Sequence, residues 1–126
     1  MSSDLTQDKF LDIPNIRDLY IRKVRLERVV DGDTIDVWKD MGERVWKLER
    51  YRLLGIDTPE RGRTGFYEAS HRLEELIKAA QKDEGFFWML TAKHGKFRWL
   101  GVLYDHDGVN LNRLMVEEGH AKVYGT

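Results

Sequence analysis

Residues 52–60 of this chain read Arg-Leu-Leu-Gly-Ile-Asp-Thr-Pro-Glu, an apolar run that carries one arginine and ends in two carboxylates. A strand here has to stop at the proline, which cannot donate to a sheet ladder. With the two-residue period of a strand, Arg52 shares a face with Leu48 and Leu54, where a guanidinium is costly unless it meets an anion. The alternative for Arg52 is a surface position on the outer face.

A second apolar run, Val29–Ile35, breaks at an acidic turn, Asp31-Gly32-Asp33. If the first and third strands lie side by side, Asp33, Asp57 and Glu60 meet at one rim, with the backbone carbonyl of Thr58 beside them. Such an all-oxygen set favours a hard ion, Ca²⁺ or Mg²⁺, over zinc. The alternative is a pair of ordinary acidic turns, in which aspartate is a favoured residue.

Length and composition predict a single domain without a strongly basic surface overall. The 126 residues are 41% hydrophobic, enough for one core. Lys+Arg 21 against Asp+Glu 22 gives a net charge of −1, so any attraction for phosphate must come from a local cluster. With no cysteine, disulfides and thiolate metal sites are excluded.

The first 20 residues are polar and contain no apolar run of signal-peptide length, and no stretch of the chain is long and apolar enough to span a membrane. We therefore expect a cytoplasmic monomer with no membrane partner, or a secreted protein if a leader was removed. Residues 1–20 are interpreted as an N-terminal extension and residues 21–126 as the domain.

Hydrophobic periodicity and turn residues predict three strands, a helix, two strands and a second helix. Five strands with a helix after the third predict a mainly β (α+β) fold, a five-stranded OB-type Greek-key barrel with two or three helices. The expected strands are 20–30, 34–39, 44–56, 86–90 and 97–104, the helices are 67–81 and 111–118, and Asn110 is the expected N-cap.

Several cations and aromatic residues outside the acidic turns are candidates for nucleic-acid contact. Arg98 opens the fifth strand, from which it could reach a bound phosphate. Loop cations could follow a nucleic-acid backbone and aromatic rings could stack on bases, although solvated charges and core or surface rings are the alternatives. These further candidates are Arg61, Arg63, Lys96, Phe97 and Tyr124.

Five motifs occur in an order that resembles the staphylococcal nuclease (thermonuclease) family over residues 22–124. The motifs are VDGDT at 30–34, RLLGIDTPE at 52–60, EA at 68–69, RWLG at 98–101 and EGHAKV at 118–123. The resemblance implies an OB-type barrel and a Ca²⁺-dependent phosphodiesterase that cleaves DNA and RNA to leave 3′-phosphate ends.

By matching positions, the resemblance implies that Asp33 and Asp57 ligate calcium together with the Thr58 carbonyl. Glu60 resembles the general base that orients or deprotonates the attacking water, and Arg52 and Arg98 resemble the arginines that neutralise the phosphate. These roles agree with metal-assisted hydrolysis, in which guanidiniums hold the charge that builds on the phosphate oxygens.

The sequence departs from the family pattern before Arg98, where Phe97 stands in the place of a frequent glycine. The loop from Glu60 to Glu68 is short, and we expect no counterpart within these residues to the third helix of the secreted staphylococcal enzyme. We expect residues 1–20 to pack where that helix would lie, and a disordered tail is the alternative. Two other functions remain open: a nuclease-derived module that only binds nucleic acid, and an OB module for protein partners. A binding-only descendant would not need the five matched polar residues.

Overall fold

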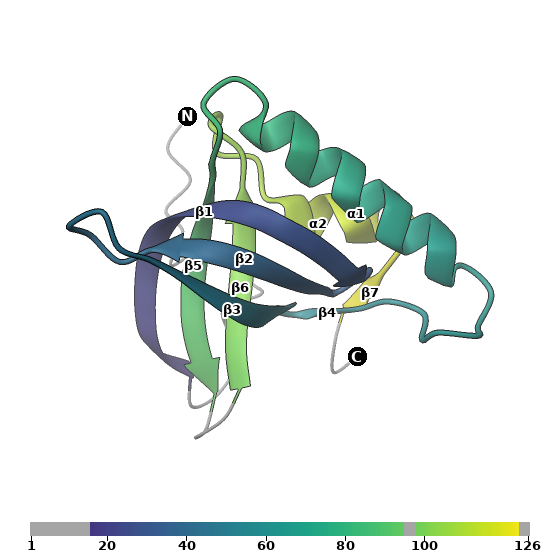
Figure 1. The fold of residues 1–126 in the computed structure, drawn as a ribbon. Helices are drawn as coiled ribbons and strands as arrows, with labels where there is room; N and C mark the ends of the chain where they lie inside the picture. Colours follow the sequence, from purple (N-terminus) through teal and green to yellow (C-terminus); the bar gives the residue numbers. More distant parts are fainter. Residues whose placement is uncertain (1–15, 95–97, 124–126) are drawn as a thin grey trace.

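The computed structural model describes residues 16–94 and 98–123, and they form a closed five-stranded barrel with two helices (Figure 1). The strands follow the barrel in the order β1-β2-β3-β6-β5, with the β3–β6 pair parallel and the others antiparallel. Two short strands, β4 and β7, form a separate pair. The bounds are β1 Ile16–Asp31, β2 Thr34–Asp40, β3 Trp46–Leu53, β4 Ile56–Asp57, α1 Phe66–Gln81, β5 Phe87–His94, β6 Arg98–Tyr104, α2 Leu111–Glu117 and β7 Lys122–Val123.

The barrel interior is filled by the side chains that alternate inward along each strand, as the period-two pattern predicts. In β2, Ile35 and Val37 are buried while Trp38 is exposed. From β3, Tyr51 and Leu53 enter the same cluster, and β5 adds Phe87 and Met89. The predicted barrel class is therefore confirmed, and its outer face on β2 and β3 is left to polar and partly exposed side chains.

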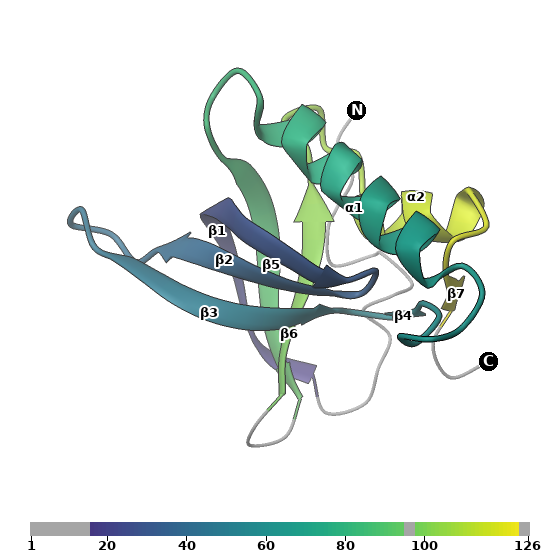
Figure 2. The same ribbon diagram turned by 45° about the vertical axis from the view of Figure 1, so that its right-hand side comes forward.

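Two helices close one end of the barrel, α1 running across it and α2 lying behind α1 (Figure 2). The predicted apolar stripe of α1 is buried, with Ala69, Leu73 and Ile77 in the core cluster. The predicted cap of α2 is present, because the Asn110 side chain accepts a hydrogen bond from the Arg113 backbone N–H at 3.0 Å. Neither described helix is long and apolar enough to cross a membrane.

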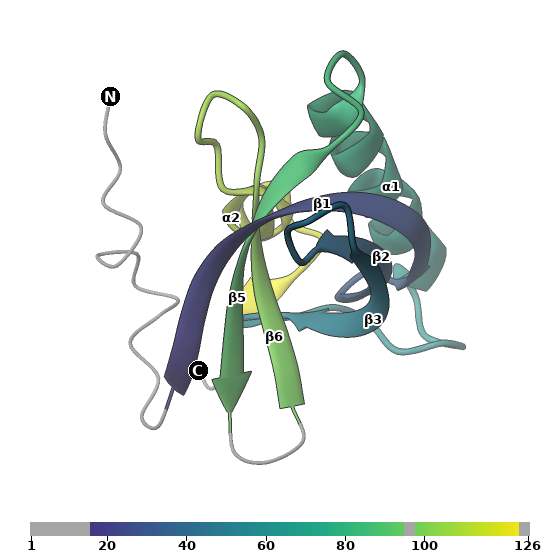
Figure 3. The same ribbon diagram turned by 60° about the vertical axis from the view of Figure 1, so that its left-hand side comes forward.

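Three element boundaries differ from the sequence prediction. Strand β1 begins at Ile16 and curves along the barrel to pair with both β2 and β5 (Figure 3). Strand β5 continues to His94, although residues 91–96 were expected to form the turn between two strands. The predicted strand 44–56 is divided, because Gly55 takes a positive φ of 80° and the chain leaves the barrel to form β4.

Candidate active site

Arg52 occupies the outer face of β3 at the point where the barrel strand ends. Its side chain is 37% exposed, so Arg52 lies on the outer surface of the barrel, as the alternative interpretation of the sequence expected. The guanidinium is nevertheless engaged by anions: Nη2 lies 3.1 Å from Asp57 Oδ1 and 3.6 Å from Asp33 Oδ2. The same Nη2 donates to the Ile56 carbonyl at 3.2 Å. Arg52 thus joins the two acidic turns identified in the sequence.

Asp33 is a buried carboxylate held by the backbone of a distant loop. Its Oδ2 accepts a hydrogen bond from the Thr58 backbone N–H at 3.0 Å, and its Oδ1 accepts one from Thr34 Oγ1 at 3.1 Å. Burial, followed by hydrogen bonding with Asp31, raises the pKa of Asp33, and the Thr58 N–H and Arg52 only partly oppose this. The site therefore concentrates negative charge that a cation would stabilise.

The two acidic turns meet because β2 pairs with β3. Thr34 lies opposite Arg52 in the antiparallel register, and the Leu53 N–H donates to the Asp33 carbonyl at 2.7 Å. The expectation that the first and third strands lie side by side is wrong, since β1 pairs with β2 and β5. A turn joining two paired strands is enough to bring Asp33 to the end of the third.

The segment after β4 is packed tightly against the turn that carries Asp33. A Cβ added to Gly32 would lie 2.8 Å from both Ala69 Cβ and Thr58 Oγ1, so only glycine fits there. Among the described residues, the buried Thr58 Oγ1 has no hydrogen-bond partner. An unsatisfied buried hydroxyl is costly, and this one faces the turn at Gly32.

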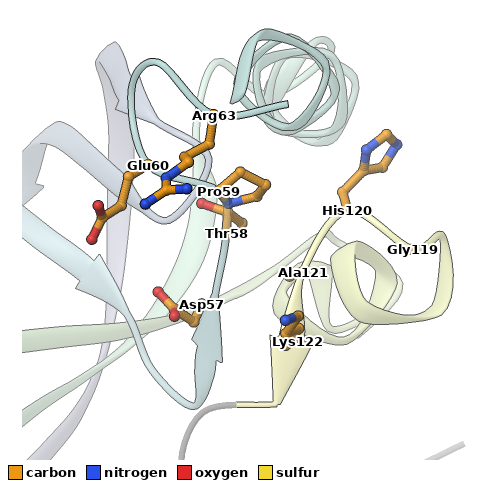
Figure 4. Close-up of a pocket in the computed structure, with 9 residues that line it drawn as sticks. All are labelled: Asp57, Thr58, Pro59, Glu60, Arg63, Gly119, His120, Ala121 and Lys122. Carbon is orange, nitrogen blue, oxygen red and sulfur yellow. The ribbon is translucent and has the colours of Figure 1, made fainter. Parts of the chain in front are cut away.

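A cavity of about 460 Å³ adjoins Asp57 and Glu60 (Figure 4). One wall is the segment Asp57–Glu60, and the other is the chain that leads into β7. Lys122 of β7 is the antiparallel strand partner of Asp57 in β4. In the close-up, the carboxylates of Asp57 and Glu60 point away from the β7 wall. The lining residues are Asp57, Thr58, Pro59, Glu60, Arg63, Gly119, His120, Ala121 and Lys122.

The predicted loop residues divide into those at the cavity and those away from it. Glu60 is exposed and lines the cavity, and Arg63 lines it as well. Arg61 instead stacks over the Phe66 ring, with its guanidinium carbon 4.8 Å from the ring centroid. His120 and Lys122 were not predicted, because only the β4–β7 pairing brings them to this cavity and no spacing in the sequence indicates that pairing.

For Arg98, the second arginine expected to bind phosphate, the structure gives the position of the backbone. Arg98 begins β6 and lies two residues before Leu100, which is the partner of Arg52 in the parallel β3–β6 pair. Predictions for Lys96, Phe97 and Tyr124 lie outside the described residues, as does the expected packing of most of residues 1–20.

The expected meeting of Asp33, Asp57 and Glu60 at one rim is wrong, since these three carboxylates do not form a close group. Among residues 16–94 and 98–123, no three carboxylate or imidazole side chains gather closely enough to hold a metal by themselves. Asp33 and Asp57 are brought together through Arg52, and the Thr58 backbone lies against Asp33 through its N–H. These oxygen donors are the ligand type that Ca²⁺ and Mg²⁺ prefer.

Comparison with known proteins identifies the family. A family model described as "Staphylococcal nuclease homologue" matches residues 50–126, more than half of the chain. The chain belongs to the staphylococcal nuclease family. The expected resemblance is therefore confirmed, and the matched residues run from β3 through Arg52 and Asp57 to the end of the chain.

Curated relatives of this staphylococcal nuclease family member carry nuclease names. The chain is 37% identical over 100 residues to an "Uncharacterized endonuclease" of Escherichia coli O157:H7, covering 79% of this chain and 60% of that protein. It is 33% identical over 110 residues to a "Micrococcal nuclease" of Shigella flexneri, covering 77% of this chain and 55% of that protein. The chain thus spans a little over half the length of these relatives.

Proposed function

We propose that this chain is a calcium-dependent nuclease that hydrolyses phosphodiester bonds of DNA and RNA and leaves 3′-phosphate ends. The observation that carries the proposal is the placement of Arg52 Nη2 at 3.1 Å from Asp57 and 3.6 Å from Asp33, whose carboxylate also accepts from the Thr58 backbone N–H. Family membership and the names of the relatives support the same reaction class.

In this proposal Asp33, Asp57 and the backbone carbonyl of Thr58 hold Ca²⁺. Bound there, the ion supplies positive charge that withdraws electron density from the phosphate. Arg52 binds a non-bridging phosphate oxygen, since its planar fork matches phosphate geometry, and Arg98 is assigned the same task from the start of β6.

Glu60 is assigned the proton chemistry. It is exposed, lines the cavity and lies three residues beyond Asp57, outside the set of metal ligands. Its carboxylate accepts a proton from water as the water oxygen attacks phosphorus. The bond from phosphorus to the 5′-oxygen breaks, and that oxygen leaves and takes up a proton from solvent water, which gives a 3′-phosphate and a 5′-hydroxyl end.

The test is incubation of the protein with single-stranded DNA, double-stranded DNA and RNA in Ca²⁺, in Mg²⁺ and in chelator, with end-group analysis of the products. We expect cleavage in Ca²⁺ alone or preferentially, with 3′-phosphate ends. Glu60→Gln and Arg52→Lys should each reduce the rate on the order of 100-fold or more, by analogy with loss of a single transition-state donor.

Arg61→Gln is the matched control, because Arg61 is a neighbouring loop cation that stacks on Phe66 rather than facing the carboxylates. Cleavage that persists in chelator, or that Glu60→Gln leaves undiminished, would refute the mechanism. Binding of nucleic acid without cleavage under any condition would identify the chain as a binding module of the same family.

A further inference from the structure

The outer face of β1, β2 and β3 carries polar and aromatic side chains in rows that begin at the candidate active site. Cross-strand pairing places Arg28, Asp36 and Arg50 in one row, next to the row that holds Arg52. The following row pairs Trp38 with Leu48, and the last pairs Asp40 with Trp46. We call the six residues Arg28, Asp36, Trp38, Trp46, Leu48 and Arg50 the outer strip.

The outer strip is exposed and leads away from the barrel body. Trp38 is 38% exposed and Leu48 47% exposed, although both are large apolar side chains. The β2–β3 hairpin that carries them extends well beyond the other strands (Figures 1 and 2). At a strand rise of about 3.4 Å per residue, the path from Arg52 to Trp46 covers roughly 20 Å. An exposed apolar and aromatic surface of this length indicates a binding face.

Charge on the strip favours an anionic partner. Arg28 Nε donates to Asp36 Oδ2 at 3.1 Å, and Arg50 Nε donates to Asp36 Oδ1 at 2.8 Å. Each guanidinium has five N–H donors, so the single carboxylate satisfies only part of the pair and the row keeps a net positive charge. Glu27, which accepts from Trp38, and Asp40 in the last row add negative charge to this face, while Arg25 opposite Trp38 adds a further cation.

Aromatic rings alternate with these cations. The Arg25 guanidinium carbon lies 4.0 Å from the centroid of the Trp46 ring, and Trp38 is held in place by donating from Nε1 to Glu27 at 2.9 Å. Flat rings next to guanidiniums suit a single-stranded nucleic acid, since bases stack on the rings while phosphates meet the cations. A surface for a second protein copy would instead be expected to be depleted of charge at its centre.

We propose that the outer strip is an extended binding track for single-stranded DNA or RNA that continues from the scissile position at Arg52 toward the β2–β3 hairpin. This inference rests on the proposed function, because it takes the Arg52 end as the place of reaction. Trp38 stacks on a base, and Arg28 and Arg50 bind phosphates. Asp36 partly neutralises the two arginines and so lowers the affinity of the strip for nucleic acid.

The experiment measures equilibrium binding of fluorescent single strands in chelator, where the proposed nuclease does not cleave. A dinucleotide is compared with an oligonucleotide of about 12 nucleotides, within the range that one OB fold covers. We expect Trp38→Ala to weaken binding of the longer strand roughly 10-fold, leave the dinucleotide unchanged and be rescued by Trp38→Phe. Tyr67→Ala is the matched control, because Tyr67 is an aromatic residue of α1 that is 72% exposed.

A charge variant tests the strip without removing any apolar group. Asp36→Asn releases both arginines, so affinity for the longer strand should rise several-fold with a steeper salt dependence. Asp83→Asn removes the same charge from the turn after α1 and should have a smaller effect. Equal effects of the two aspartate variants, or of Trp38→Ala and Tyr67→Ala, would overturn the proposal.

Sedimentation and cleavage assays separate the remaining outcomes. If Trp38→Ala dissociates a dimer and leaves nucleic-acid binding unchanged, the strip is a contact between copies and the proposal fails. If the wild-type protein cleaves nucleic acid but strip variants bind both lengths normally, the inference fails and the proposed function stands. If length-dependent binding is present without any cleavage, the track stands and the proposed function fails.

Discussion

The carboxylate of Asp33 accepts a hydrogen bond from the backbone N–H of Thr58 at 3.0 Å, across 25 residues of sequence. This contact fixes the turn between β1 and β2 against the segment that follows β4. It also aligns a buried carboxylate with Asp57, the other predicted ligand, through Arg52. The arrangement keeps a charged group buried, and its raised pKa reflects the cost of that burial.

Calcium is therefore expected to stabilise the fold through Asp33. Saturating Ca²⁺ should raise the melting temperature of the wild-type protein by about 5–10 °C, since a ligand that binds only the folded state stabilises it by mass action. Asp33→Asn should abolish this shift and cost little stability in chelator, because it removes a buried charge. Asp107→Asn, in an exposed turn, is the control and should retain the shift. An unchanged shift in Asp33→Asn would exclude Asp33 as a ligand.

The close approach at Gly32 predicts a steric effect on the same site. In Gly32→Ala the new methyl group would lie 2.8 Å from Ala69 Cβ and from Thr58 Oγ1, so α1 or the Thr58 segment must move. We expect a loss of about 1–3 kcal/mol in the free energy of unfolding, together with weaker Ca²⁺ binding. Urea denaturation and calcium titration measure the two effects.

A double-mutant cycle with Ala69→Gly tests whether the clash is the cause. Ala69→Gly alone should cost about 1 kcal/mol, because it places glycine inside a helix. In the Gly32→Ala background the same change should cost less or restore stability, since it removes one of the two clashing atoms. Strictly additive effects would show that the close approach to Thr58 Oγ1, and not to Ala69 Cβ, causes the loss.

Asn112 is predicted to be a major determinant of stability in α2. It is fully buried, donates to the carbonyls of Leu54 and Gly101, and accepts from the Leu103 N–H. Asn112→Ala would remove the side-chain partner of the Leu54 carbonyl and of the Leu103 N–H, while the Gly101 carbonyl still accepts from the Leu54 N–H at 2.9 Å. We therefore expect a loss of roughly 2 kcal/mol or more. Glu117→Ala, an exposed change in the same helix, should be nearly neutral in urea denaturation. Comparable losses in the two variants would contradict the role of Asn112.

The two asparagines of this region show what a sequence can predict. Asn110 was identified as an N-cap because capping is local, and its side-chain acceptor meets a backbone N–H three residues away. Asn112 serves backbone groups of β6 and of the turn after β3, which are adjacent only in the folded chain. No local pattern indicates such a role.

The same distinction holds for the candidate active site. Arg52, Asp33 and Asp57 were identified from residue type and position at strand ends, and the structure joins them. The strand adjacency assumed for them was wrong, because pairing order depends on closure of the whole barrel. His120 and Lys122 were missed for the same reason. The strand β7, near the C-terminal end of the sequence, pairs with β4, which lies more than 60 residues earlier.

A buried ion pair on the β2–β3 hairpin predicts acid sensitivity. Lys39 Nζ lies 2.6 Å from Glu49 Oε1 and 2.6 Å from the Tyr51 hydroxyl, with Lys39 and Glu49 both mostly buried. Burial raises the pKa of Glu49, but the hydrogen bond and charge of Lys39 outweigh it, so the pKa lies below its ordinary value of 4.5. The stability that Glu49 contributes is therefore present above pH 4.5 and lost as the pH falls through the lowered value.

Glu49→Gln should cost roughly 3 kcal/mol at pH 7, because it leaves Lys39 buried without its counter-ion. The difference in unfolding free energy between wild type and Glu49→Gln should shrink as the pH falls below 4.5 and through the lowered pKa of Glu49, where the wild-type carboxylate also becomes neutral. Glu43→Gln removes a carboxylate from an exposed turn and controls for net charge. Replacing both partners, Lys39→Met with Glu49→Leu, should be much closer to neutral, since it leaves no buried charge. A pH-independent difference for Glu49→Gln would show that packing of the side chain, rather than its charge, stabilises the hairpin.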